Sequence, residues 1–262
     1  MKTSEALGVA DVSVKTSEAV PRSGGRFLVS EAKQSKTIGL IGGMSWESTA
    51  LYYKIINEEI KTNLGGLHSA KILLYSVDFS EIEECQANGE WERAGDILAG
   101  VAKNLELAGA DFIAICTNTM HKVEPQIKAN LQIPILHIAT ATADELKAKN
   151  IDKTILLGTK YTMTQDFYKE RLVNSGIEVF IPNENEIEFI NSVIFNELCL
   201  GKILSSSKEK FLKIINRLAN LGAKSVILGC TEIGLLISQD DLGIPVFDTT
   251  IIHAKKCAQI SL

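Results

Sequence analysis

Short apolar runs separated by amphipathic stretches make up most of this chain. Between the runs, apolar residues recur at helical spacing, as at Leu51, Ile55 and Ile60. Strands that alternate with helices predict an α/β fold with mostly parallel sheets covered on both faces. In the first part of the chain, the runs that predict buried strands lie at 36–43, 70–77, 111–116, 133–138 and 153–159.

The expected helices have recognisable ends. Ser45 is a suitable N-cap for the helix that follows the first strand. Glycine follows each of three helices in the second half of the chain, as expected for helix ends. We expect helices at 92–107 and 118–130, then at 164–175 before Gly176, 186–200 before Gly201, 208–221 before Gly222, and finally 251–260.

Similar short sequences recur in the two halves of the chain. Lys36-Thr37-Ile38 resembles 153–155, Cys116-Thr117 resembles 230–231, and Ile133-Pro134-Ile135 resembles 244–246. The members of each pair are separated by nearly the same length of chain, and such internal similarity indicates a duplication. The chain therefore predicts two pseudo-symmetric, three-layer α/β domains with mostly parallel sheets and an active site in the cleft between them.

The repeated motif places a cysteine at the carboxyl end of a strand and at the start of a helical pattern. In open α/β sheets, ligands bind beyond the carboxyl ends of the strands, so Cys116 and Cys230 are expected on opposite walls of one cleft. Helix-start amides stabilise a thiolate and a bound carboxylate. The short polar side chains of Thr117, Asn118, Thr119 and Thr231 suit the same carboxylate.

Two thiols facing one carbon suit inversion of a stereocentre. One thiolate removes a proton from one side while the other thiol returns a proton from the opposite side. An ordinary cysteine has a pKa of about 8.5, so modest tuning keeps one group deprotonated near neutral pH. The sequence contains neither G-x-G-x-x-G nor a phosphate-loop motif, and this scheme uses no cofactor.

Other residues are weaker candidates for the same cleft. Glu232 is placed to orient the Cys230 thiol or a substrate ammonium group, or simply to favour a helix start. Met44 is a candidate roof of the pocket, and His121 and His253 lie near it in sequence. Ser80 and Thr159 follow strands, while Lys160, Lys169 and Arg171 are candidate cations for an acidic side chain.

Composition narrows the class of protein. The 262 residues are 45% apolar and carry a net charge of −5, without a basic patch, so we expect a small-molecule partner and no nucleic acid. No apolar run approaches the roughly 20 residues of a membrane helix, and no export signal is visible. These features predict a cytoplasmic protein without a membrane partner.

The five cysteines do not form a disulfide or zinc pattern. Their number is odd, they lack C-x-x-C spacing, and we assign Cys85, Cys199 and Cys257 to packing or to the surface. A zinc site made of Cys116, His121 and Cys230 is an alternative to the two-thiol mechanism, although no metal is expected. Residues 1–36 are rich in Ser, Lys, Glu and Gly, and we interpret them as a disordered leader or tag.

Three motifs, in order, make the chain resemble the cofactor-independent aspartate/glutamate racemase family. They are Gly42-Gly43-Met44-Ser45-Trp46-Glu47-Ser48-Thr49, Cys116-Thr117-Asn118-Thr119-Met120-His121 and Gly229-Cys230-Thr231-Glu232. The likeness covers about residues 36–262. It implies Cys116 and Cys230 as catalytic bases, and substrate contacts from Thr117 to Thr119 and from Thr231 and Glu232.

The resemblance also implies how the chain is divided. We expect residues 37–132 and 240–262 in the first domain and 133–239 in the second, with assembly as a homodimer. Aspartate-specific relatives place an arginine after the strand that matches 70–77, where this chain reads Asp78-Phe79-Ser80. Their second anchor, a lysine, corresponds to Lys169.

The substrate therefore stays open at this stage. Aspartate or glutamate is the first expectation, and racemisation of neutral polar amino acids is the alternative because one of the two side-chain anchors is missing. A cysteine-dependent decarboxylase or isomerase, which needs only one thiol, and a non-catalytic amino-acid-binding protein are further alternatives.

Overall fold

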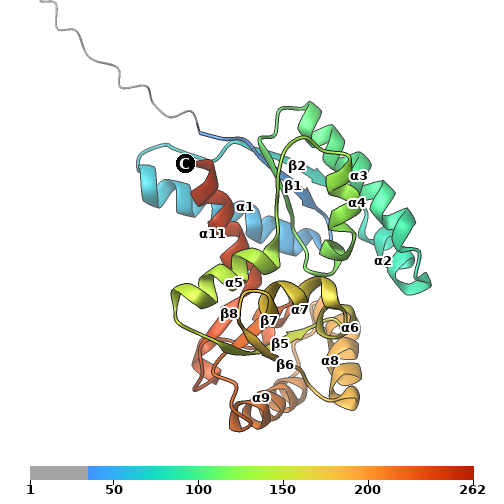
Figure 1. Cartoon of the computed structure of the whole chain (residues 1–262), viewed down its shortest axis with the longest axis vertical. Helices are drawn as coiled ribbons and strands as arrows, with labels where there is room; N and C mark the ends of the chain where they lie inside the picture. Colours follow the sequence, from blue (N-terminus) through green and yellow to red (C-terminus); the bar gives the residue numbers. More distant parts are fainter. Residues whose placement is uncertain (1–34) are drawn as a thin grey trace, which may run out of the picture. The chain divides into compact units, whose positions relative to one another are not determined.

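The computed structural model describes residues 35–262, so the leader predicted at 1–36 lies almost wholly outside the described residues. Within this range the strands form two four-stranded parallel sheets (Figure 1). The first contains β1 (Ile38–Gly42), β2 (Ile72–Ser76), β3 (Phe112–Ile115) and β4 (Ile135–Leu136). The second contains β5 (Lys153–Gly158), β6 (Glu178–Phe180), β7 (Val226–Gly229) and β8 (Val246–Asp248).

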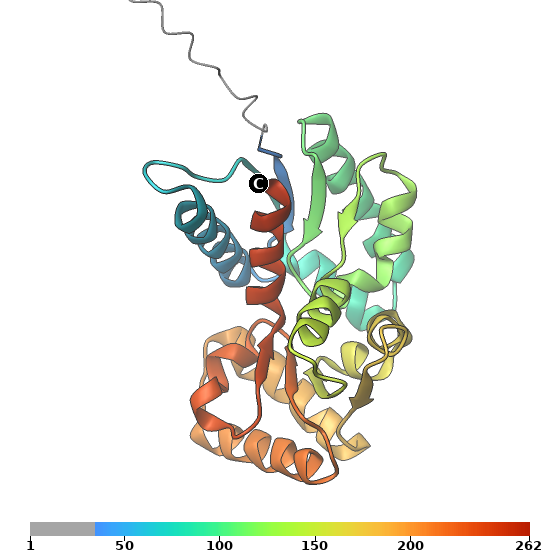
Figure 2. The ribbon, with the colours of Figure 1, turned by 60° about the vertical axis from the view of Figure 1, so that its left-hand side comes forward.

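The two sheets have the same topology. Their strand orders are β2-β1-β3-β4 and β6-β5-β7-β8, and every neighbouring pair is parallel. Helices connect successive strands and cover both faces of each sheet (Figure 1, Figure 2). The predicted fold class, two pseudo-symmetric three-layer α/β units, is confirmed.

The helices fall into two matching sets. In the first half they are α1 (Trp46–Leu64), α2 (Phe79–Asn88), α3 (Trp91–Leu107), a 3-10 turn at Thr119–Val123, α4 (Glu124–Ala129) and α5 (Ile138–Ala148). In the second half they are α6 (Lys160–Thr164), α7 (Asp166–Val173), α8 (Glu184–Asn196), a 3-10 turn at Leu198–Leu200, α9 (Ser205–Asn220), α10 (Ile233–Leu236), a 3-10 turn at Gln239–Asp241 and α11 (Thr249–Ser261).

The two halves exchange one helix each. α5 follows β4 of the first sheet, yet its buried residues Ile138 and Leu146 pack with Leu156 and Tyr168 of the second half. α11 follows β8 of the second sheet, yet its buried residues pack with α1, including Tyr52. Figure 2 shows α11, in red, running from the second sheet to the first. Each sheet is therefore completed by a helix from beyond the last strand of the other.

This exchange bears on the expected domain ranges. β4 pairs with β3 in the first sheet, although the expected second domain begins at 133, and β8 pairs with β7 in the second sheet, although the expected first domain resumes at 240. α11, the last helix, packs on α1 of the first half. The ranges 37–132 plus 240–262 and 133–239 stay a prediction, and the strand pairing moves both crossing points toward the carboxyl ends of β4 and β8.

The start of α1 shows why the sequence forms this strand-to-helix turn. Ser45 caps α1 and accepts a hydrogen bond from the Ser48 amide at 3.3 Å, as predicted for an N-cap. Gly43 has a φ of 95°, and a Cβ there would collide with the Val77 carbonyl oxygen. Only glycine fits this position, because the turn passes against the end of β2.

Three predicted helices have a different form. The helix expected at 186–200 is α8, which ends at Asn196, followed by the 3-10 turn Leu198–Leu200. The helix expected at 118–130 is a 3-10 turn followed by the short α4, which has Pro125 in its first turn. Proline has no amide hydrogen to donate, so it is tolerated there but does not extend an earlier helix. The helix expected at 164–175 is α7, which starts at Asp166; Gln165, with an extended backbone, separates it from the short α6 that ends at Thr164. Gly176, Gly201 and Gly222 all have positive φ, as predicted for helix ends.

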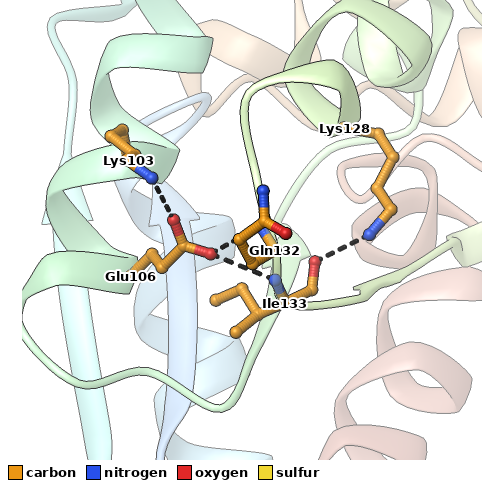
Figure 3. A network of polar contacts seen from close by, with 5 residues as sticks. All are labelled: Lys103, Glu106, Lys128, Gln132 and Ile133. Atoms are coloured by element: carbon orange, nitrogen blue, oxygen red, sulfur yellow. Dashed lines mark hydrogen bonds and ion pairs between the residues drawn. The ribbon is translucent and has the colours of Figure 1, made fainter.

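The loop that leads into β4 is fixed by side chains from α3 and α4. The Glu106 carboxylate accepts hydrogen bonds from the amides of Gln132 and Ile133, at 2.7 and 3.0 Å, and pairs with Lys103 at 2.6 Å (Figure 3). Lys128 donates to the Ile133 carbonyl oxygen at 2.9 Å. These bonds set the start of the short strand that precedes the first crossing between the sheets.

Backbone hydrogen bonds give the correspondence between the two halves. The Ile113 amide donates to the Pro134 carbonyl oxygen, and the Val226 amide donates to that of Pro245 in the same way. Ile113 and Val226 are therefore equivalent positions. Continuing along both strands from this pair makes Thr117, rather than Cys116, the counterpart of Cys230. The alignment of the two halves by sequence motif, which matches Cys116 with Cys230, therefore differs by one residue from the alignment given by the hydrogen bonds.

The packing of the strands supports the same register. Ile113 and Ile115 face the helix layer that contains α3, and Val226 and Leu228 face the equivalent layer with α8 and α9. Cys116 faces the opposite layer, with α1 and α11. Because side chains alternate along a strand, a shift of one residue turns a side chain to the other face of the sheet.

Among residues 35–262, none of the helices combines the length and apolar character that crossing a membrane requires.

Candidate active site

The ends of the central strands of the two sheets are joined by hydrogen bonds. Thr119, after β3, shares a hydrogen bond of 3.0 Å with Thr159, after β5. Ser45, at the start of α1, donates to Glu232 at 3.0 Å, across 187 residues of sequence. The carboxyl ends of the parallel strands therefore meet, as expected for a ligand site in an α/β protein.

A third connection reaches the end of β8. The Asn118 side-chain amide donates to the Thr249 hydroxyl at 3.0 Å, and that hydroxyl donates to the Leu228 carbonyl oxygen at 2.9 Å. Because the Thr249 hydroxyl donates its only proton to the Leu228 carbonyl oxygen, it can only accept a hydrogen bond from Asn118. The Asn118 side chain therefore turns its nitrogen toward Thr249 and its Oδ1 away from it. Asn118 Oδ1 is buried and has no hydrogen-bond partner in the described part of the chain.

A small cavity of about 30 Å³ lies at this junction. Such a volume holds one or two water molecules and is too small for an amino acid, so this is a closed form of the site. Its lining residues come from both halves: Met44, Phe79, Gln86, Thr117, Asn118, Thr119, Thr159, Ile194, Phe195, Cys199, Gly229, Cys230, Thr231 and Glu232.

Cys230 has a carboxylate as its nearest polar partner. Its Sγ lies 3.0 Å from Glu232 Oε2, which also accepts from the Thr231 hydroxyl at 2.6 Å. Burial raises the pKa of the Cys230 thiol well above its usual value, and the negative charge of Glu232 raises it further. The thiol is therefore protonated in this closed form, with an acceptor in place for its proton.

Cys116 lies in a different environment. Its side chain is fully buried in the apolar cluster with Tyr52, Ala254 and Cys257, and it is not among the residues that line the cavity. Its Sγ makes a long hydrogen bond to the Ala114 carbonyl oxygen, at 4.0 Å. Burial, followed by the nearby Cys257, raises the pKa of the Cys116 thiol well above its usual value. Its catalytic role stays a prediction.

The backbone around both cysteines offers donors for an anion. The amides of Thr117, Asn118 and Thr231 have no acceptor within residues 35–262. Unpaired amides at helix starts are favourable partners for a carboxylate. With Asn118 Oδ1 and the Glu232 carboxylate as acceptors, the site offers complementary groups for both ends of a zwitterionic amino acid.

His121 holds the loop after β3. Its Nε2 accepts the Ile138 amide at 3.2 Å, so its Nδ1 carries the proton and donates to the Thr117 carbonyl oxygen at 2.8 Å. Burial, with His253 nearby, lowers the pKa of His121 to about 3, so the ring is neutral. Both ring nitrogens are occupied, which removes His121 as a zinc ligand in the alternative with Cys116 and Cys230.

Most of the predicted site residues lie together, with two exceptions besides Cys116. Ser80 is exposed on α2, and the preceding residue, Phe79, lines the cavity instead. Lys169 lies on α7, away from the lining, and pairs with Asp166 at 3.7 Å. Neither of the side-chain anchors expected from aspartate-specific relatives is therefore at this cavity.

Sequence reasoning missed one wall of the cavity. Gln86 comes from α2, Ile194 and Phe195 from α8, and Cys199 from the following 3-10 turn. The assignment of Cys199 to packing or to the surface was incomplete, because it lies near Cys230 and Glu232. Burial and Glu232 raise the pKa of Cys199 to about 12. These residues follow no strand and carry no motif, so only the fold brings them to the site.

A family model for Asp/Glu/Hydantoin racemases matches residues 41–257. The chain belongs to this family. The match includes both cysteine motifs and the whole cavity lining, and it confirms the predicted resemblance and the enzyme class, an amino-acid racemase. The family acts on small-molecule amino acids, in agreement with the expected small-molecule partner.

Solved structures and a curated relative support the assignment. A Yersinia pestis protein classed with the Asp/Glu racemases is 52% identical, with a TM-score of 0.82 over 86% of this chain and 99% of that one. An aspartate racemase homologue from Pyrococcus horikoshii is 38% identical, with a TM-score of 0.74 and the same coverage. The broad specificity amino-acid racemase RacX of Bacillus subtilis is 24% identical over 83% of this chain and 95% of its own length.

Proposed function

We propose that this racemase inverts the α-carbon of neutral amino acids by two-base proton transfer, with Cys230 and Cys116 as the two acid/base groups. The observation that carries this proposal is the Cys230 thiol, hydrogen-bonded to Glu232 at the junction of the two strand ends. Glu232 accepts the thiol proton and leaves a thiolate that removes the α-proton. The second group then returns a proton from the opposite face of the planar intermediate.

The carboxylate and ammonium groups of the substrate have distinct partners in this proposal. The free amides of Thr117, Asn118 and Thr231 receive the α-carboxylate, whose charge suits helix starts. Asn118 Oδ1 receives the α-ammonium group. The positive charge of the ammonium group near Cys230 favours the thiolate once substrate is bound.

Cys116 is assigned as the second base because of its position in the chain. It directly precedes Thr117 at the end of the central strand, and its motif is part of the family resemblance. In the closed form its sulfur lies in the apolar layer beneath α1 and α11. Admission of an amino acid must enlarge a 30 Å³ cavity, and the same opening lets the loop at 116–119 turn the Cys116 sulfur toward the substrate.

The lining of the cavity favours a neutral side chain over aspartate or glutamate. Among the fourteen lining residues there is no lysine or arginine, and Glu232 is the one carboxylate. An acidic side chain would meet no cation and would lie close to Glu232, which is electrostatically unfavourable. Ile194, Phe195 and Cys199 instead offer apolar surface. The broad specificity that names the Bacillus subtilis relative agrees with this choice.

A substrate panel tests the proposal. The protein is incubated in D2O with single enantiomers of methionine, leucine, homoserine, aspartate and glutamate. Optical activity and α-deuterium incorporation are followed for each. The kcat/KM for neutral amino acids should be at least about tenfold higher than for aspartate and glutamate. The reason is that the side-chain carboxylate of an acidic substrate would lie in the pocket without a partner, which is unfavourable. Preference for aspartate would refute the substrate assignment while leaving the racemase mechanism intact.

We also propose that the protein is a homodimer and that the edge of the first sheet forms the contact. β2 is an edge strand, and Leu74 and Tyr75 on it are exposed, as are Leu64 and Leu67 at the end of α1 and just after it. Exposed apolar side chains on a sheet edge are a common interface. Light scattering after size-exclusion chromatography should give the mass of a dimer for the wild type and of a monomer for Tyr75→Lys. A monomer mass for the wild type would refute the proposed homodimer.

A further inference from the structure

A second cavity in the described part of the chain is larger than the one at Cys230 and has separate walls. Its volume is about 530 Å³, within the range of small-molecule sites. Its walls come from α5, the end of β7, α10 with the following turn, β8 and α11. None of its lining residues is shared with the small cavity at Cys230, and nothing in the proposed racemisation uses it.

The floor of this cavity is apolar. Phe247 and Ile237 are buried there, while Ile251 and Ile252 are more exposed on α11. A floor of this kind suits the hydrocarbon or ring portion of a ligand. Because the cavity is much larger than one water molecule, an organic ligand displaces several waters from apolar surface, and this favours binding.

The rim carries cationic charge that is not already paired. Lys149 pairs with Glu145 at 3.1 Å, and the Asp248 carboxylate is engaged by amides at the start of α11. The remaining charged lining residues are Lys255, Lys256 and Asp144. Neither lysine has an ion-pair partner among residues 35–262, so a ligand carboxylate or sulfonate finds two free cations on α11.

The wall between the two cavities is a single segment of chain. Residues 229–232 line the cavity at Cys230, whereas Leu228, Gly234 and residues 237–239 line the larger one. The larger cavity also lies between α5 and α11, the two helices by which the chain crosses from sheet to sheet. A ligand bound here contacts both helices that connect the two sheets, and movement of these helices would widen the cavity at Cys230.

We infer that this larger cavity is an effector site for small organic anions with an apolar body, and that its occupancy changes substrate binding at Cys230. The binding half of this inference is independent of the proposed function, because it is measured without turnover. The coupling half rests on the racemase activity.

The fluorescent anion 8-anilinonaphthalene-1-sulfonate is a suitable probe, because its sulfonate and rings match the two parts of the cavity. It should bind the wild type saturably, and benzoate should displace it whereas inorganic phosphate should not. The double substitution Lys255→Glu and Lys256→Glu should weaken binding at least about tenfold, since charge-assisted contacts are lost. The double substitution Lys61→Glu and Lys147→Glu, at exposed positions outside the lining, is the charge-matched control and should leave the affinity within about twofold.

A cavity-filling variant removes the dependence on charge. Ala148→Trp, at the last residue of α5, should abolish probe binding, whereas Ala129→Trp, at the last residue of α4, should not. Equal probe affinity in Ala148→Trp and Ala129→Trp would overturn the site. Probe binding that falls as protein concentration rises would also overturn it, since the cavity would then be a contact between copies.

The coupling is measured by racemisation of the best substrate with and without saturating probe. We expect the KM to change about fivefold in the wild type, a typical coupling between two sites, and to stay constant in Ala148→Trp. An unchanged KM with the probe fully bound would overturn the coupling and leave a binding site without effect on the enzyme.

Discussion

Cys116 and Cys230 carry the same short motif but lie in different surroundings. Cys230 is partly exposed to the cavity and has Glu232 as a hydrogen-bond partner at 3.0 Å. Cys116 is fully buried against α1 and α11, with Cys257 rather than a carboxylate nearby. The two halves therefore share one topology, while the chemical surroundings of their two cysteines differ.

The difference has a mechanistic consequence. Burial raises the pKa of both thiols, but only Cys230 has an acceptor ready for its proton. A two-base racemase needs one deprotonated and one protonated group at the start of each turnover. In the mechanism proposed above, this asymmetry makes Cys230 the base that starts from the resting enzyme and Cys116 the acid, and substitutions of the two residues test this division.

The largest effect is expected from removing either thiol. Cys230→Ala should lower kcat for racemisation at least about 10³-fold, because general acid/base catalysis at the α-carbon is lost. Cys116→Ala should lower it by a similar factor. Circular dichroism of the amino acid measures the rate, and far-ultraviolet dichroism of the protein checks the fold. A Cys116→Ala protein that racemises at the wild-type rate would exclude the two-thiol mechanism.

The two variants should differ in partial reactions. In the proposed mechanism, Cys230 abstracts the α-proton of one enantiomer. The Cys116→Ala variant should therefore still exchange the α-proton of that enantiomer with D2O, but it should not invert the α-carbon. Cys230→Ala should exchange only the other enantiomer. Mass spectrometry of recovered substrate measures this, and exchange of both enantiomers by one variant would contradict the assignment of faces.

Glu232→Gln should have the next largest effect. It removes the proton acceptor of Cys230 and should lower kcat about tenfold to a hundredfold. It also removes a negative charge that raises the pKa of Cys230, so that pKa should fall. Iodoacetamide alkylates the thiolate, so alkylation of Cys230 should reach its half-maximal rate at a lower pH in Glu232→Gln than in the protein that retains Glu232.

The alkylation experiment needs a background without the second pocket thiol. Cys199→Ser supplies it, because Cys199 lines the same cavity. In this background Glu232→Gln should move the midpoint for Cys230 downward in pH and leave the slow labelling of buried Cys116 unchanged. A midpoint that rises would mean that Glu232 stabilises the thiolate rather than the thiol.

A smaller effect is expected at Thr117, the backbone counterpart of Cys230. Thr117→Val keeps the shape and removes the hydroxyl, which should raise KM about fivefold with little change in kcat, since one hydrogen bond to substrate is lost. Steady-state kinetics separate these parameters. A loss of kcat as large as that of Cys230→Ala would instead make Thr117 the reacting group on its wall.

The smallest effect on activity is expected at Cys257, which packs beside Cys116. Cys257→Ala removes a buried sulfur and should cost about 1–2 kcal/mol of unfolding free energy, as for other small cavities. The kcat of the folded protein should stay near wild type. Urea titration and kinetics measure the two quantities, and a large loss of kcat without loss of stability would show that Cys257 takes part in the reaction.

The sequence alone determined the architecture and the chemical type of the site. Apolar runs alternating with helical patterns predicted the parallel α/β order, because buried parallel strands need apolar side chains on both faces. Motifs at strand ends identified Cys230, Glu232 and the polar residues at 117–119, because strand ends in such folds supply ligands. These features are local, so they can be read from neighbouring residues.

Only the tertiary structure decided which side chains share the cavity. Phe195 and Cys199 reach it from a segment far before Cys230 in the sequence, and the exchange of α5 and α11 depends on where β4 and β8 pair. The facing of Cys116 depends on a one-residue difference between the sequence motif and the hydrogen-bond register. Motif similarity does not contain that register, since it is set by pairing between distant strands, and each step along a strand turns the side chain to the opposite face.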